Sequence, residues 1–130
     1  MFASSMSRAA AYASVGKQTS VATASPHDLI LMLFDGAIVS IGTAAIAMDA
    51  KDTPTKGNAI SKAIEIIVNG LKVSLDMNAG GELAQRLAAL YDYMAERLLH
   101  ANLHNSRAAL DEVGKLLREL REAWVQIDAG

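Results

Sequence analysis

Two of the three histidines have a spacing that could bind a metal ion. His100 and His104 are four residues apart, so both imidazoles would lie on one face of a helix. A di-iron bundle needs a Glu-x-x-His motif on each of two helices, together with further glutamates. Here Glu96 precedes His100 by four residues, and no second pair of this kind occurs. Because His104 also lies where its helix is expected to end, we predict no metal site and no cofactor.

The remaining chemical candidates are isolated residues. His104 and Arg107 loosely resemble a phosphoacceptor histidine beside a positive charge, but they fall at an expected helix junction. His27 is expected to be exposed in a first helical turn, and Asp35 to be partly exposed or hydrogen-bonded at a helix crossing. The pair Gly80-Gly81 lacks the following Lys-Ser/Thr of a phosphate loop and is predicted to be a turn. We predict no catalytic residues, and nothing in the sequence indicates an enzyme.

The composition is typical of packed helices. The 130 residues fit one domain, with 52% hydrophobic but only 5% aromatic residues and two prolines. The absence of cysteine excludes disulfides, thiolate metal sites and a cysteine nucleophile. A net charge of −2 is unlike that of a nucleic-acid-binding protein, so we predict no nucleic-acid partner.

Residues 29–48 form an apolar stretch of about the length that crosses a membrane. Asp35 lies near its middle and no basic cluster flanks it, so we predict a buried helix at the centre of a bundle and no membrane partner. Residues 1–24 lack the unbroken apolar segment of a secretory signal. We expect them to form a flexible N-terminal arm that precedes a bundle domain of residues 25–130.

Four helices are expected in that domain. The first begins at Ser25-Pro26 and runs to about Met48; the second begins at Pro54, with Thr53 as a possible cap. The third follows the Gly80-Gly81 turn, and the fourth follows a break at residues 102–106. The apolar positions expected to face the core are Ile60, Ala63, Ile64, Ile67, Val68, Leu71 and Leu75; then Leu83, Leu87, Leu90, Tyr91, Met94 and Leu98; then Leu110, Val113, Leu117, Leu120, Trp124 and Ile127. Short connections predict an all-α, antiparallel up-down-up-down four-helix bundle.

The second and third helices carry more apolar residues than one core face needs. On a helical wheel, a second stripe on the second helix lies roughly opposite Ile64 and Leu71. The stripe consists of Ala59, Ile66, Gly70, Val73 and Met77, and a side strip on the third helix consists of Ala84, Ala88, Ala95 and Leu99. We predict that these residues bind an amphipathic partner segment in a groove. The arm is expected to fold back over the groove, with Tyr12 and Val15 as its anchors.

The chain resembles the FliS family, the flagellin-specific export chaperones of bacteria. The resemblance covers nearly the whole chain, in the family's order and spacing. It is carried by Ala11-Tyr12, Thr23-Ala24-Ser25-Pro26-His27-Asp28-Leu29-Ile30, Met32-Leu33-Phe34-Asp35-Gly36-Ala37, Lys62-Ala63-Ile64-Glu65-Ile66-Ile67, Asn69-Gly70-Leu71, Gly80-Gly81-Glu82-Leu83-Ala84, Leu90-Tyr91-Asp92-Tyr93-Met94, Ala101-Asn102-Leu103, Glu112-Val113 and Ala123-Trp124. Each piece alone is common, but together they are highly specific.

The resemblance implies a chaperone of the bacterial cytosol that binds the disordered C-terminal segment of flagellin. Such a chaperone prevents premature polymerisation of flagellin and assists its delivery to a component of the flagellar export gate. Other flagellar regulators are further partners to consider, and the sequence leaves open whether the chain is a monomer or a homodimer.

Two other classes of function were weighed against the chaperone. An enzyme or metal-binding bundle would need convergent polar groups inside the bundle, which the pattern does not show. A scaffold would self-associate through the last helix, whose apolar residues have coiled-coil-like spacing.

Overall fold

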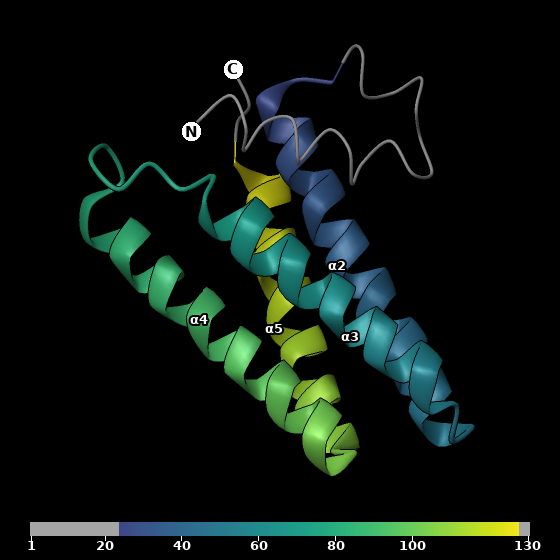
Figure 1. Cartoon of the computed structure of the whole chain (residues 1–130). Coiled ribbons are helices and arrows are strands. Elements are labelled where there is room, and N and C mark those ends of the chain that lie inside the picture. The colour runs from purple at the N-terminus through teal and green to yellow at the C-terminus, as the bar shows by residue number, and fades with distance from the viewer. Residues whose placement is uncertain (1–23, 128–130) are drawn as a thin grey trace.

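The computed structural model describes residues 24–127, which form four helical rods packed together (Figure 1). In chain order the elements are α2 (Pro26–Asp49), α3 (Thr53–Ile66), the π-helix η1 (Ile67–Lys72), α4 (Gly81–His104) and α5 (Arg107–Gln126). Helix α3 and η1 are continuous and form one rod. Successive rods run in opposite directions, which confirms the predicted up-down-up-down bundle.

Local sequence signals fix where most helices begin. Ser25 caps α2, its hydroxyl oxygen accepting a hydrogen bond from the Asp28 backbone nitrogen at 3.1 Å, and Pro26 is the first helical residue. Ser106 caps α5 in the same way, accepting from the Ala109 nitrogen at 3.2 Å. The predicted cap of the second helix is wrong by one residue. Asp52 is the cap, and Thr53 is already helical.

Helix α2 is the central packing element of the bundle. It lies against α3 on one side and α5 on the other, and α4 completes the ring by packing against α5, α3 and η1. By length and composition α2 could also cross a membrane. In this structure its buried residues face the protein instead: Leu29, Leu33, Phe34, Ala37, Ser40, Ile41, Ala44 and Ala47.

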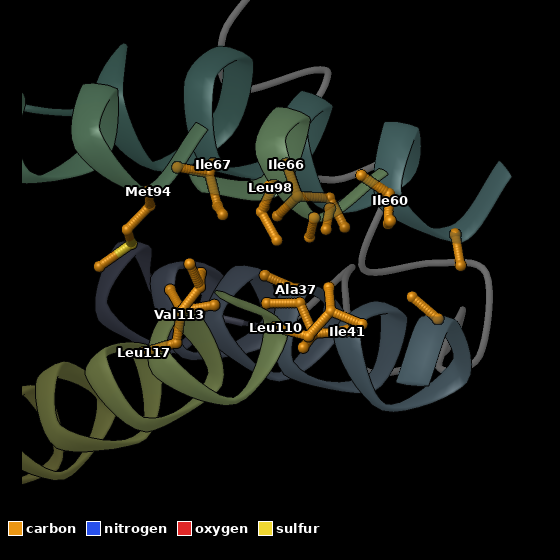
Figure 2. Packing of buried hydrophobic residues seen from close by; sticks show 14 of the residues in the cluster. Ala37, Ile41, Ile60, Ile66, Ile67, Met94, Leu98, Leu110, Val113 and Leu117 are labelled. Carbon is orange, nitrogen blue, oxygen red and sulfur yellow. The ribbon is translucent and has the colours of Figure 1, made fainter. Parts of the chain in front are cut away.

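The core is built from residues of all four rods (Figure 2). Its fully buried large side chains are Leu33, Ile60, Ile66, Ile67, Met94, Leu98, Leu110, Val113 and Leu117. Figure 2 shows Ile66 and Ile67 on one side of this core, with Val113 and Leu110 on the other. Burial of such side chains contributes roughly 1.5–3 kcal/mol each relative to leaving them exposed.

The buried face of the second rod differs from the predicted one. Ile66 is 1% exposed, whereas Ile64 is only partly buried. The predicted core residues Ile60, Ala63, Ile67 and Leu71 are buried, and the buried arc extends beyond them to Ala59, Ile66 and Gly70. At roughly 100° per residue, Ala59, Ile66 and Gly70 lie about 120–160° around the helix from Ile64. The rod packs between α2 and α4, so its buried arc includes the small residues that face α2.

Two further positions in the predicted core are exposed, and a third packs against the core only in part. Leu83 is 66% exposed in the first turn of α4, and Ile127 is 51% exposed just after the end of α5. Trp124 is only partly buried. Leu83 and Ile127 lie near the start of α4 and just after the end of α5, whereas Trp124 packs against the edge of the core.

Candidate functional site

The predicted partner-binding residues divide into buried and exposed groups. Val73, Met77 and Leu99 are 47%, 47% and 53% exposed, and Ala88 is half-buried. The structure buries Ala59, Ile66, Gly70 and Ala84, so their predicted placement off the core face is wrong. Tyr12 and Val15 lie outside the described residues.

The burial of Gly70 and Ile66 has a direct steric cause. A Cβ atom placed on Gly70 would lie 3.2 Å from a methyl carbon of Leu33, and one placed on Gly36 would lie 3.4 Å from Ile66 Cδ1. Small residues thus bring the second rod into close contact with α2. The helical wheel assigned the core face from the large apolar residues. It therefore missed the side that faces α2, where small residues make the closest contacts.

Large apolar side chains are exposed on α2 and α4, near the end of α5 and in the segment that follows η1. Within residues 24–127 they are Val39, Ile46, Val73, Met77, Leu83, Tyr93, Leu99, Leu103, Val125 and Ile127. The sequence analysis missed Val39 and Ile46 on α2, because apolar residues around most of that helix were interpreted as a sign of burial on all sides. The signal was available, since Val39, Thr43 and Ile46 have the i, i+4, i+7 spacing of a single face.

A shallow hollow of about 290 Å³ lies between α2 and α3. Its lining comprises Val39, Ser40 and Thr43 from α2, and Thr55, Asn58, Ala59 and Lys62 from α3. Exposed Val39 and nearly buried Ala59 form its apolar part, and hydroxyl and amide groups form its polar part. The predicted contact residue Ala59 therefore lines a surface hollow, although little of its own side chain reaches solvent.

The π-helix η1 ends the second rod beside the exposed residues Val73 and Met77. The wider π-turn is accompanied by a hydrogen bond from the Ser74 hydroxyl to the Gly70 carbonyl oxygen at 2.6 Å. Lys72, the last residue of η1, forms an ion pair with Asp92 of α4 at 2.8 Å. These contacts place the 73–77 segment at the junction between the second rod and α4.

Polar pairs join the rods at the surface. Glu112 of α5 accepts hydrogen bonds from the Tyr93 hydroxyl and from Arg97 of α4, which lower the pKa of its carboxyl group, and the Glu112 bond raises the pKa of Tyr93. Asp35 of α2 pairs with Arg121 of α5 at 2.5 Å, which agrees with the predicted partly exposed or hydrogen-bonded carboxylate. By contrast, burial raises the pKa of Tyr91 to about 12. The pairs formed by Glu112 and by Asp35 connect helices and do not converge on a reaction centre.

His27 is not the simply exposed residue that the sequence predicted. Its Nε2 lies 2.9 Å from the Trp124 carbonyl oxygen, and the Trp124 Nε1 donates to the His27 carbonyl oxygen at 3.0 Å. The two rings are stacked, with centroids 5.0 Å apart. This pair joins the first turn of α2 to the last turn of α5, across 97 residues of sequence. His27 and Trp124 therefore link the start of α2 to the end of α5.

Comparison with known proteins supports the family suggested by the sequence motifs, over most of the chain. The family model described as "Flagellar protein FliS" matches residues 8–130. The chain is 52% identical over 117 residues to the flagellar secretion chaperone FliS of Salmonella typhimurium, covering 90% of this chain and 87% of that protein. It is 46% identical to the Escherichia coli protein of the same name, covering 88% and 84%, and 43% identical to flagellar secretion chaperone FliSB of Pseudomonas aeruginosa, covering 87% and 89%.

The chain belongs to the FliS family of flagellar proteins. This confirms the resemblance carried by the scattered motifs. The family consists of non-enzymatic flagellar secretion chaperones, so the prediction that the chain is not an enzyme is confirmed by descent. A chaperone of this kind implies a flagellar substrate.

The self-associating scaffold is the less favoured alternative on this geometry. Leu110, Val113 and Leu117, the central residues of the α5 seam, are fully buried inside the bundle. They are therefore occupied by contacts within the chain and are not available for a second copy.

Proposed function

We propose that the protein binds the disordered C-terminal segment of flagellin in the bacterial cytosol. It thereby prevents premature polymerisation and assists delivery to a component of the flagellar export gate. Family membership supports the chaperone class, and the observation that carries the substrate proposal is the set of ten large apolar side chains exposed on α2 and α4, near the end of α5 and in the segment after η1. A disordered tail can cover such a distributed surface in extended and helical pieces, whereas a rigid ligand would need one deep pocket.

Four of the predicted residues remain as contacts in this proposal. Leu99 offers an exposed apolar side chain on α4, and Val73 and Met77 offer two more at the end of the second rod. Ala88, half-buried on α4, adds a small apolar surface. Ala59, Ile66, Gly70 and Ala84 are buried in the free chain and are therefore not proposed as direct contacts.

Calorimetric titration of the full-length chain with intact flagellin, and with flagellin lacking its C-terminal region, tests the substrate. Binding should require the C-terminal region and give a negative heat-capacity change, because apolar surface leaves water. Equal affinity for the truncated flagellin would contradict the proposal.

A pair of substitutions on α4 tests the surface. Leu99→Asp should weaken flagellin binding about tenfold or more, because it places a charge in an apolar contact. Gln85→Asp, at an exposed polar position of the same helix, is the matched control and should bind as the parent does. Circular dichroism verifies that both variants fold. Equal binding by Leu99→Asp and the control would remove Leu99 from the contact surface.

The proposal also includes the N-terminal arm, with Tyr12 and Val15 covering part of the apolar surface until flagellin arrives. Its support is the presence of apolar side chains within an otherwise small and polar segment. A truncated chain starting at Thr19 should bind more of a hydrophobic dye than the full-length chain. Unchanged dye binding would show that the arm covers nothing.

A further inference from the structure

His100 and His104 lie next to each other on the exposed side of α4. The helix continues through His104, and only Asn105, in the left-handed conformation with φ 50°, ends it. This removes the objection that His104 lies beyond the helix. The two imidazole centroids are 4.7 Å apart, with their planes inclined at 44°. Both residues are exposed, so a solvent ion can reach the rings.

This ring separation suits a shared metal ion. A divalent transition metal binds an imidazole nitrogen at about 2.0–2.1 Å, and two such ligands at a near-tetrahedral angle place their ring centroids about 5 Å apart. The observed 4.7 Å is close to that value. Rotation of the exposed side chains therefore suffices to bring one nitrogen of each ring onto a common ion, without movement of the helix backbone.

The electrostatic surroundings also favour a cation. The partial negative charge at the C-terminal end of a helix attracts positive charge, and His104 is the last residue of the 24-residue α4. Glu96 lies one turn before His100 on the same face. The nearby cation Lys56 is buried, and its ammonium group donates to the Asn102 carbonyl oxygen and the Asn105 side-chain oxygen. The lysine therefore approaches from the bundle interior, while both histidines face solvent.

We propose that His100 and His104 form a two-histidine site for a divalent transition metal ion of the Ni²⁺, Cu²⁺ and Zn²⁺ class. Imidazole suits these ions and does not suit Mg²⁺ or Ca²⁺. Within residues 24–127 no group of three or more His, Asp or Glu side chains is placed to hold a metal, so water completes the coordination. A bound ion links the last two turns of α4. The site stands apart from the proposed function and does not depend on flagellin.

The chain has few other side chains that could bind a transition metal and so confuse a test of this site. It has no cysteine, and its only other histidine, His27, is held by Trp124. Calorimetric titration of the untagged full-length chain with NiCl₂ at neutral pH should show one ion per chain, and MgCl₂ should give no binding. His100→Gln and His104→Gln should each weaken Ni²⁺ binding about tenfold or more.

A composition-preserving variant provides the matched control. Leu99→His combined with His100→Leu keeps two histidines on α4 but places them five residues apart, on different faces of the helix. It should bind Ni²⁺ as weakly as the single variants, and Ni²⁺ should raise the melting temperature of the parent chain only, because binding to the folded state stabilises it. Undetectable binding to the parent at millimolar Ni²⁺, or equal binding by the parent and the variants, would overturn the proposal.

Discussion

Helix α5 and the rod formed by α3 and η1 contribute to the same core, yet they present their apolar residues in different ways. Helix α5 buries one narrow seam through Leu110, Val113 and Leu117, opposite a broad charged face. The α3–η1 rod buries an arc that includes Ala63, Ile66 and Gly70, and it leaves apolar side chains outside that arc as well.

The difference shows when a hydrophobic pattern is sufficient to orient a helix. In α5 the polar residues exclude all but one orientation, so the pattern alone determines the buried face. In α3 apolar residues occur on more than one side, and neighbours on two sides select among them. The selection follows the closest approach to α2, where a Cβ on Gly70 would lie 3.2 Å from Leu33.

The largest expected effect distinguishes the two isoleucines of α3. Ile66→Asp should abolish cooperative folding, because it places an unpaired carboxylate in the core at a cost comparable to the stability of a whole domain. Ile64→Asp should fold with a lowered denaturation midpoint, because its side chain is only partly buried and can reach water. Urea unfolding followed by circular dichroism measures both. If Ile64→Asp proves the more damaging, the buried face assigned to this rod is wrong.

A smaller effect is expected at the C-terminal end of α5, where the seam leaves the core. Trp124→Ala should cost about 2 kcal/mol, below the 3–5 kcal/mol typical of a fully buried tryptophan, because the ring is partly exposed. Leu117→Ala, in the buried part of the same seam, is the matched comparison and should cost about 3–4 kcal/mol. The two denaturation midpoints are compared at one pH. A larger loss from Trp124→Ala would show that its stack and hydrogen bonds with His27 outweigh simple burial.

The smallest effects come from adding one methyl group to each rod. Gly70→Ala should lower the unfolding free energy by about 1 kcal/mol, because the new Cβ crowds the fully buried Leu33. Gly114→Ala in α5 should raise it by about 0.5–1 kcal/mol, because its Cβ meets the movable end of Arg118 at 3.2 Å and Ile41 Cγ2 at an ordinary contact distance of 3.7 Å, and the helix gains propensity. Thermal melts of the two variants should therefore shift in opposite directions. Shifts of the same sign would show that close packing against α2 does not distinguish the rods.

Much of the fold was predictable because the signals for it are local. Ser25 and Ser106 each bond a backbone nitrogen three residues away, and Gly81, at φ 52°, adopts the conformation that glycine permits at the start of α4. Interactions of this range depend on a few neighbouring residues and can be recognised in any sequence. The family, too, was recognisable from motifs spread along the chain.

The candidate site was less predictable because exposure depends on distant parts of the chain. Leu99 and Val73 were placed correctly outside the core, but Ile66 and Ala84 have the same apolar character and are buried. Side-chain type alone does not distinguish these pairs. What distinguishes them is whether another rod lies against that side of the helix, which depends on residues far away in the sequence.

The sequence by itself determined the four rods, their boundaries to within a few residues, the family and the buried part of the α5 seam from Leu110 to Leu117. Tertiary structure decided which side of the α3–η1 rod is buried, how Trp124 engages His27 across 97 residues, and that Lys56 reaches the end of α4. The physical reason is the range of the interactions. Caps and helical periodicity act within one or two turns, whereas the orientation of a helix with several apolar sides is set by the shape of the neighbours it packs against.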